Sequence, residues 1–321
     1  MSETQSILVT GGAGFIGSYL VERLLNEGHT VTVIDDFSTG SRENLRAVAE
    51  HPRLRLIASK VSDCVELAGI VAKVEAVYHL AAAVGVDLVV KSPIRTITTN
   101  LSETEVLLEA AGHRAVPVLI TSTSEVYGKS QKEMFSEEDD LLIGPPHLAR
   151  WSYACSKLMD EFLAMAYARE HQLPVIIARL FNTVGPRQTG QYGMVLPRFI
   201  ASAKAGQPLQ VYGDGRQTRC FCYVEDTVEA LIRLQRTPAA CGEVFNVGND
   251  EETTIQGLAE LVIKTVGSPS VVEHVPYGQA YAPGFEDMLR RRPLIEKCAH
   301  FTGFRPRRSL REIVSLTAGL G

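Results

Sequence analysis

The feature that most constrains this 321-residue chain is a repeated alternation of short apolar runs and helix-like segments. In the first half the apolar runs are continuous, which is typical of parallel strands buried on both faces. These runs cover residues 6–10, 29–34, 54–58, 74–80, 116–122 and 173–180. Helical patterns lie between them at 15–28, 93–112 and 151–172. The alternation predicts an α/β fold built on a doubly wound parallel sheet.

The pattern changes after Arg179. Residues 181–199 are rich in Gly, Pro and polar side chains, and residues 207–224 suggest short strands around a Gly-Asp-Gly turn. We therefore expect a sheet domain and a smaller C-terminal lobe at the carboxyl edge of the sheet, where ligands of open α/β sheets bind. The expected bounds are 1–181 for the first, completed by about 220–248, and 182–219 with 249–321 for the second.

Composition and charge exclude several classes of function. The net charge is −5 with no basic stripe, so we expect no nucleic-acid partner. The longest apolar runs fall well below the roughly 20 residues of a membrane helix. The first residues, MSETQSILVTGG, show neither region of a signal peptide, and the expected location is the cytoplasm. The six cysteines form no CxxC pair, so no metal site is predicted.

A glycine-rich turn follows the first predicted strand and leads into a helix. Gly11 permits a tight turn, Gly14 lets the backbone approach a pyrophosphate, and Gly17 allows close helix–strand packing. The second strand ends in Asp35-Asp36, and 35 − 17 = 18 residues is close to the spacing of about 20 for an acid that binds a ribose 2′-hydroxyl. Because a carboxylate repels the 2′-phosphate of NADP, the pattern predicts NAD.

Tyr153 and Lys157 lie four residues apart in the helical segment 151–172, so both face the same side. A free tyrosine has a pKa of about 10. We expect the ammonium of Lys157 and a positive nicotinamide ring to favour the phenolate. A phenolate at that point can take the proton of a sugar hydroxyl while the carbon gives hydride to NAD⁺.

The stretch TSTSEVYG (121–128) crowds hydroxyls and a carboxylate at the end of a strand. Together with the glycine turn, DDFSTG (35–40) and HLAAA (79–83), it resembles the extended short-chain dehydrogenase/reductase family. This is the branch of nucleotide-sugar epimerases, dehydratases and decarboxylases, and the likeness runs over nearly the whole chain. The resemblance implies a Rossmann-type sheet, NAD as cofactor and a UDP-sugar substrate.

The resemblance also assigns cofactor contacts. Asp36 stands where many members have Asn, and Lys60-Val61 stands where an Asp-Ile or Asp-Val pair often meets the adenine, which implies a remodelled pocket with binding retained. The residues assigned to NAD are Gly11, Gly14, Phe15, Ile16, Gly17, Asp35, Asp36, Thr39, Gly40, Lys60, Val61, Leu80, Ala81, Ala82, Ala83, Asn100, Ser122, Tyr153 and Lys157.

Substrate contacts follow in the same way. Arginine suits phosphate oxygens because it offers a fork of donors. Of the three consecutive arginines 290–292, the resemblance favours Arg292, although either neighbour could serve. The residues assigned to the substrate are Val84, Thr123, Asn182, Leu196, Tyr212, Arg219 and Arg292.

By resemblance, Thr123 binds the reacting hydroxyl and shares its proton with Tyr153. Oxidation at C4 makes the C5 proton acidic, and Glu125 is a plausible base for it. In 4,6-dehydratases the run reads Thr-Asp-Glu, with Asp as the acid for the leaving hydroxyl, whereas Ser124 occupies that place here. Thr-Ser-Glu also occurs in UDP-glucuronate decarboxylases, which need no such acid.

Several functions therefore remain open. The chain as a whole resembles dehydratases that remove water across C5 and C6 of UDP-N-acetylglucosamine, and this function is favoured. A UDP-glucuronate decarboxylase and a UDP-hexose 4-epimerase are alternatives. A regulatory protein that binds NAD without turnover is disfavoured by the intact Thr123, Tyr153 and Lys157.

The helices at 93–112 and 151–171 carry more apolar residues than the sheet needs. These include Ile94, Ile97, Met159 and Met165. Relatives that the chain resembles pair two such helices across a two-fold axis, which implies a homodimer with a four-helix bundle.

Overall fold

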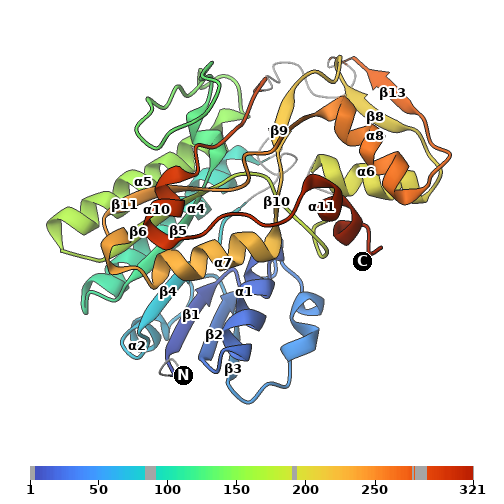
Figure 1. Ribbon diagram of the computed structural model, residues 1–321. Helices are drawn as coiled ribbons and strands as arrows, with labels where there is room; N and C mark the ends of the chain where they lie inside the picture. Colours follow the sequence, from blue (N-terminus) through green and yellow to red (C-terminus); the bar gives the residue numbers. More distant parts are fainter. Residues whose placement is uncertain (1–3, 84–91, 190–193, 277, 279–287, 321) are drawn as a thin grey trace.

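The computed structural model describes residues 4–83, 92–189, 194–276, 278 and 288–320 (Figure 1). At its centre is a seven-stranded sheet in the order β11-β6-β5-β4-β1-β2-β3, with all neighbours parallel. Its strands are β1 (Ser6–Thr10), β2 (Thr30–Asp35), β3 (Leu54–Ala58), β4 (Ala76–His79), β5 (Val118–Thr123), β6 (Val175–Leu180) and β11 (Glu243–Val247). The predicted doubly wound parallel sheet is confirmed, and the late strand β11 completes it beside β6.

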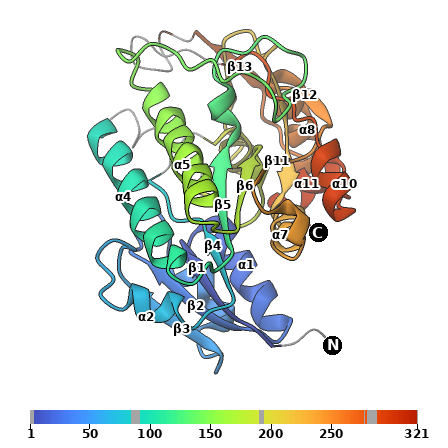
Figure 2. The same cartoon turned by 90° about the vertical axis from the view of Figure 1, so that its left-hand side faces the viewer.

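Helices cover both faces of the sheet. On one face α4 (Pro93–Gly112) and α5 (Trp151–Glu170) lie side by side, with α2 (Leu67–Val71) next to α4 (Figure 2). On the other face are α1 (Phe15–Asn26) and α7 (Val224–Gln235), with α10 (Glu296–Thr302) against α7. Each layer has its own apolar core, which explains why the strands read as continuous apolar runs.

The small lobe has a separate core. It contains α6 (Val195–Lys204), α8 (Ile255–Val266), α11 (Leu310–Thr317) and the parallel pair β8 (Leu209–Tyr212) and β13 (Val272–Val275). Short pairs connect it to the sheet domain: β7 (Thr183–Val184) with β10 (Cys222–Tyr223), and β9 (Thr218–Cys220) with β12 (Glu252–Thr254). Short 3₁₀ helices are η1 (Arg42–Val48), η2 (Ser124–Tyr127) and η4 (Pro238–Ala240).

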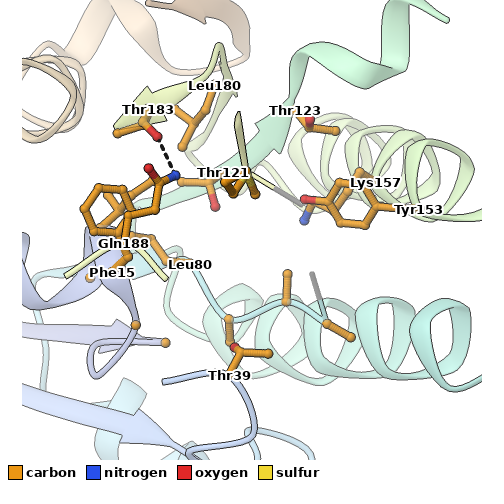
Figure 3. Close-up of a pocket in the computed structure, with 18 of the residues that line it drawn as sticks. Phe15, Thr39, Leu80, Thr121, Thr123, Tyr153, Lys157, Leu180, Thr183 and Gln188 are labelled. Carbon is orange, nitrogen blue, oxygen red and sulfur yellow. Dashed lines mark hydrogen bonds between the residues drawn. The ribbon is translucent and has the colours of Figure 1, made fainter. Parts of the chain in front are cut away.

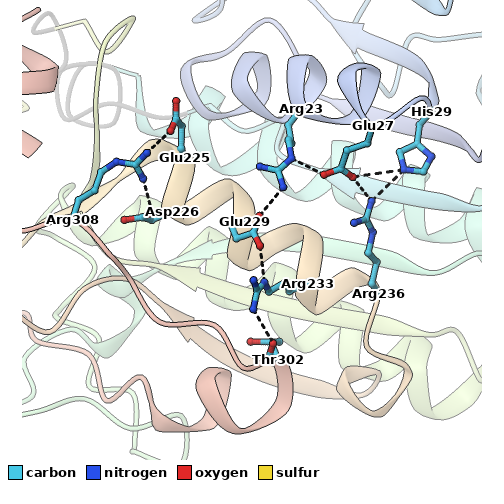
Figure 4. A network of polar contacts seen from close by, with 10 residues as sticks. All are labelled: Arg23, Glu27, His29, Glu225, Asp226, Glu229, Arg233, Arg236, Thr302 and Arg308. Carbon is cyan, nitrogen blue, oxygen red and sulfur yellow. Dashed lines mark hydrogen bonds and ion pairs between the residues drawn. The ribbon is translucent and has the colours of Figure 1, made fainter. Parts of the chain in front are cut away.

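Ion pairs join α1, α7 and the C-terminal segment around Arg308 (Figure 4). Glu229 on α7 binds Arg23 of α1 at 2.9 Å and Arg233 at 2.6 Å. Arg308 binds Asp226, near the start of α7, at 2.6 Å. Pairs at a surface contribute little free energy, so their main effect is to fix where the C-terminal segment crosses the sheet domain. In the part of the chain that the structure describes, no helix is long and apolar enough to cross a membrane.

Candidate active site

A cavity of about 490 Å³ lies at the carboxyl ends of the central strands, with walls from the sheet domain and the small lobe. The strand order reverses between β1 and β4, which is where ligands of open α/β sheets bind. The predicted residues that line it are Gly11, Gly14, Phe15, Ile16, Gly17, Asp35, Asp36, Thr39, Lys60, Val61, Leu80, Ala81, Ala82, Ala83, Ser122, Thr123, Ser124, Glu125, Tyr153, Lys157, Asn182, Tyr212 and Arg219.

The glycine turn forms one end of the cavity. Gly11 has φ +70°, and a Cβ there would lie 2.7 Å from the backbone nitrogen of Ala81. A Cβ on Gly17 would overlap the carbonyl oxygen of Gly11. A Cβ on Gly14 would meet only that oxygen within 4 Å, so its other side is open. The first turn of α1 has no side-chain cap, and its N–H groups suit a pyrophosphate.

Asp35 and Asp36 differ in what they contact. The buried Asp35 carboxylate accepts hydrogen bonds from the backbone N–H groups of Ala13 and Phe37, each at 2.8 Å. Burial raises the pKa of Asp35 above its ordinary value, against those two bonds. Asp36 is exposed at the cavity rim. Gly40 does not line the cavity; its Cα packs on Ala13, where a Cβ would lie 2.9 Å from the carbonyl.

Glu103 of α4 is a lining residue that the sequence reasoning missed. Its carboxylate accepts hydrogen bonds from the N–H of Val61 at 2.5 Å and the hydroxyl of Ser62 at 2.6 Å. The N–H of Val61, which the resemblance placed near the adenine, is therefore used to fix its own loop. An acidic residue on the sheet-facing side of a helix was the available signal.

Asn100 supports the cavity without lining it. Its side chain accepts a hydrogen bond from the N–H of Ala83 at 2.7 Å and donates one to Ser156 at 3.0 Å. It therefore ties the segment after β4 to α5. Val84, predicted to contact substrate, lies outside the described residues.

Tyr153 and Lys157 lie on consecutive turns of α5, with their polar ends directed into the cavity (Figure 3). Thr123 ends β5 above them, and its hydroxyl oxygen accepts the N–H of Glu125 at 3.2 Å. That bond starts η2 and leaves the hydroxyl proton of Thr123 available as a donor. The turn places Thr123, Glu125 and Tyr153 around one cavity.

Other residues of the TSTSEVYG stretch have a structural role. The hydroxyl of Ser122 donates to Glu161 of α5, which also binds Arg179 of β6 at 2.7 Å. Arg179 donates to the phenol oxygen of Tyr127 at 3.0 Å, and Tyr127 donates to Asn246 of β11 at 2.7 Å. This buried network fixes α5 and η2 to three strands.

Burial dominates the electrostatics of Tyr153 in the chain alone, and the predicted effect of a positive nicotinamide ring stays a prediction. In the chain alone its pKa is raised above 10, mainly by burial and then by the charges of Glu125 and Asp160. Lys157 donates to Asp160 at 2.8 Å, and both side chains are almost fully buried. Lys157 is thus paired with Asp160, which the sequence analysis did not consider, and burial raises the pKa of Asp160 against the charge of Lys157.

The small lobe supplies the far end of the cavity. Asn182, Tyr212 and Arg219 line it, and the guanidinium of Arg198 lies 4.0 Å from the ring centre of Tyr212. Leu196 does not line it, because its side chain is fully buried in the lobe core. Other lining residues that the sequence analysis missed come from loops and helix ends: Ser41, Asn44, Arg150, Arg187, Gln188 and Met194.

The arginine run 290–292 places Arg291, rather than Arg292, in the cavity. The carbonyl of Arg292 accepts the N–H of Phe135 at 2.8 Å, and Leu294 donates back to Phe135 at 2.9 Å. This short bridge sets the orientation of the run. Arg291 then reaches Glu125, with 3.4 Å between Nη1 and Oε1.

A family model described as the NAD dependent epimerase/dehydratase family matches residues 7–248. The chain belongs to this family. Among curated relatives, it is 41% identical to a UDP-N-acetyl-alpha-D-glucosaminuronate decarboxylase of Bacillus cytotoxicus, covering 93% of this chain and 92% of that protein. It is 38% identical to UDP-glucuronic acid decarboxylase 3 of Arabidopsis thaliana, covering 95% and 86%.

Solved structures agree with this family assignment. The crystal structure of UDP-glucuronic acid 4-epimerase from Bacillus cereus, in complex with UDP-glucuronic acid and NAD, matches with a TM-score of 0.87 and 30% identity, covering 98% of each chain. The epimerase/dehydratase family predicted from the motifs is therefore confirmed, and so is NAD as the cofactor. The open face of Gly14 and the uncapped N-terminus of α1 fit the pyrophosphate of this cofactor.

Proposed function

We propose that the protein is a dehydratase that removes water across C5 and C6 of UDP-N-acetylglucosamine. The observation that carries this proposal is the position of Glu125. Its carboxylate lines the cavity close enough to Tyr153 to raise the pKa of the phenol. An epimerase needs no base besides Tyr153, so a carboxylate beside it, as a second base, suits removal of H5.

The steps follow from the residues around the cavity. Tyr153 takes the proton of the C4 hydroxyl, with Thr123 as a hydrogen-bond donor to the same oxygen. NAD, when bound, accepts the hydride of C4 and later returns it. The resulting C4 ketone makes H5 acidic, and Glu125 removes it. The C6–O bond then breaks, Glu125 returns its proton to the departing oxygen, and water leaves. Tyr153 finally protonates the C4 oxygen.

The separate roles of the two parts of the chain support a UDP-sugar substrate. In this proposal residues 1–181 with 220–248 bind NAD, and 182–219 with 249–321 bind the nucleotide-sugar. Arg219 and Arg291 supply guanidinium groups, which suit phosphate oxygens. Tyr212 and Arg198 form a stacked pair that suits the uracil. Overall resemblance to the UDP-N-acetylglucosamine 5,6-dehydratase of tunicamycin biosynthesis supports the same substrate.

A UDP-hexuronate decarboxylase is the second candidate. The names of the curated relatives favour it, as does Ser124, since decarboxylation needs no acid at that place. The Thr-Ser-Glu run of such decarboxylases includes the same glutamate, so Glu125 is compatible with a substrate carboxylate at C6. Arg291, with Nη1 3.4 Å from Oε1 of Glu125, offers that carboxylate a guanidinium.

Product masses separate the candidates. The NAD-loaded enzyme is incubated in parallel with UDP-N-acetylglucosamine, UDP-N-acetylglucosaminuronate and UDP-glucuronate. Loss of water from the first supports the dehydratase, and loss of carbon dioxide from either acid supports the decarboxylase. An unchanged mass with inversion at C4 indicates an epimerase. Tyr153→Phe is the control, because it removes the first proton acceptor for every outcome.

We also propose a homodimer through α4 and α5. Their outer surface exposes Ile94, Ile97, Met159 and Phe162, with exposed fractions of 79%, 36%, 49% and 60%. Such a row of large apolar side chains suits a second copy of the same helix pair. Met165, which the sequence analysis included, packs against the core below α5 instead.

A further inference from the structure

Glu103 is a buried carboxylate in the wall of the cavity. It lies on α4 and is 4% exposed, and Thr99, one turn earlier on the same helix, also lines the cavity. Its Oε2 accepts the N–H groups of Val61 at 2.5 Å and Ser62 at 3.4 Å, and its Oε1 accepts the hydroxyl of Ser62 at 2.6 Å. A carboxylate offers about four acceptor positions, so Glu103 can accept one more hydrogen bond.

The cavity wall runs outward along the sheet from β1 to β3, and this order indicates where each part of NAD fits. The pyrophosphate suits the N-terminus of α1, which follows β1, and the adenosine ribose suits the acidic residues that end β2. The adenine would then lie beyond the ribose, beside residues 59–61 after β3 and Glu103 of α4, all of which line the cavity. Ile34, Val61 and Ala81 line it too and pack in one apolar cluster, which suits a flat base.

This end of the cavity departs from the pattern of the relatives that the chain resembles. In many of them an Asp at position 60 meets the adenine, whereas this chain has Lys60, whose ammonium donates hydrogen bonds and accepts none. The N–H of Val61, the next residue, is already donated to Glu103. Glu103 therefore supplies a carboxylate to the region where position 60 lacks one.

We propose that Glu103 is a specificity residue for the cofactor, and that its carboxylate accepts a hydrogen bond from the 6-amino group of adenine. This amino group is the hydrogen-bond donor of the base, so it is the part of adenine that a carboxylate can recognise. The three donors from residues 61 and 62 hold the carboxylate in place, so it cannot turn to suit a base with a different edge. The proposal rests on NAD as the cofactor, and not on which sugar the protein converts.

Nicotinamide hypoxanthine dinucleotide tests this contact, since it has an oxygen in place of the 6-amino group of NAD⁺ and a proton on N1. The oxygen would face the carboxylate of Glu103, and two acceptors cannot form a hydrogen bond. The full-length protein is equilibrated with equal, excess concentrations of the two dinucleotides, and the bound fraction is released and separated by chromatography. We expect about 10–100 times more bound NAD⁺ than analogue, the range for one hydrogen bond to a charged group. Equal amounts would overturn the proposal, and this comparison needs no substitution that could unfold the chain.

Glu103→Gln changes the recognition and keeps the contacts to the loop. The amide oxygen can still accept the N–H of Val61, and the amide nitrogen can donate to the hydroxyl of Ser62 and to the oxygen of hypoxanthine. We expect the excess of bound NAD⁺ over the analogue to fall by about 10-fold or more. If the variant keeps the wild-type ratio, even with weaker binding of both dinucleotides, Glu103 serves only to hold residues 61 and 62 and the proposal fails.

Glu105→Gln is the matched control, because it makes the same change of charge on the exposed side of α4, two residues away. It should leave the ratio of bound dinucleotides at its wild-type value. If Glu105→Gln lowers the ratio as much as Glu103→Gln does, the overall charge of the helix is the cause and the proposal is wrong. No sugar is present in these measurements, so a wrong substrate assignment would leave them unaffected.

Discussion

Arg291 Nη1 lies 3.4 Å from Oε1 of Glu125, joining residues that are 166 positions apart in sequence. Both side chains are mostly buried at the mouth of the cavity, with exposed fractions of 16% and 22%. A guanidinium held against one carboxylate oxygen leaves the other oxygen for the substrate. The pair thus connects the arginine run 290–292 to the end of β5 and orients the proposed C5 base.

Glu125→Gln should separate oxidation from elimination. The amide keeps the size of the side chain and loses its basic oxygen, so product formation should fall by about 10²–10⁴-fold. Oxidation at C4 depends on Tyr153, Lys157 and Thr123, and the substrate should still reduce bound NAD⁺, seen as NADH absorbance. In deuterated water H5 should stay in place. Normal turnover, or loss of cofactor reduction as complete as in Tyr153→Phe, would show that Glu125 is not a separate base.

This pair shows which site residues could be predicted from the sequence and which could not. Glu125 stood out in the sequence because hydroxyls and a carboxylate crowd together after an apolar run, and the structure places it in the cavity. Arg291 could not be distinguished from its neighbour Arg292, since the choice depends on the bridge from Phe135, some 150 residues away, to the arginine run. Asp160 was missed for a related reason: a carboxylate three residues after Lys157 looks like an ordinary surface pair until burial is known.

Central parts of the fold were predictable on local grounds. Continuous apolar strands and the glycine spacing are set by the sheet and the turn themselves, so β1 and α1 begin where the sequence predicts. The strand β11 was harder, because Glu243–Val247 follows a long excursion and pairs with β6 only through tertiary contacts. Gly40, Asn100 and Leu196 resemble ligand contacts in sequence, yet they support or lie behind the cavity wall.

Gly17→Ala should destabilise the turn that holds the pyrophosphate. The new methyl group would overlap the carbonyl oxygen of Gly11, so we expect a loss of about 1–3 kcal/mol in unfolding free energy and weaker NAD binding. Calorimetric titration with NAD and urea unfolding measure the two effects. Gly69→Ala is the control, because nothing lies within 4 Å of its added Cβ and alanine favours the helix α2. Equal NAD affinity in both variants would contradict the role of Gly17.

His79 predicts a dependence of stability on pH. Burial and the charge of Lys157 lower its pKa from 6.5 in the unfolded chain to about 3 in the fold. Below pH 6.5 the unfolded chain binds a proton that the folded chain does not, so stability is lost as pH falls towards 3. The loss is at most about 1.4 kcal/mol per pH unit. Urea unfolding at several pH values between 7 and 5 gives the unfolding free energy as a function of pH. Its slope against pH should be shallower for His79→Gln than for the wild type. Exposed His171→Gln is the control, and identical slopes for all three proteins would contradict the buried neutral imidazole.

The proposed dimer depends on the apolar surface of α4 and α5. Phe162→Asp places a charge where the two copies would meet, and we expect it to convert a dimer to a monomer in sedimentation velocity at micromolar concentration. Exposed Val271→Asp, beside β13 in the small lobe, should remain dimeric. A wild-type protein that sediments as a monomer would contradict the proposal.

The most direct measurement uses UDP-N-acetylglucosamine carrying deuterium at C4, with the NAD-loaded enzyme and no added cofactor. We expect a product lighter by one water, with deuterium still on C4 and two vinyl protons on C6, because the hydride leaves C4 and returns to it. Mass spectrometry and proton NMR of one sample report all three features. Deuterium in a C6 methyl group, an unchanged mass with inversion at C4, or no reaction while UDP-N-acetylglucosaminuronate loses carbon dioxide would contradict the proposed dehydratase.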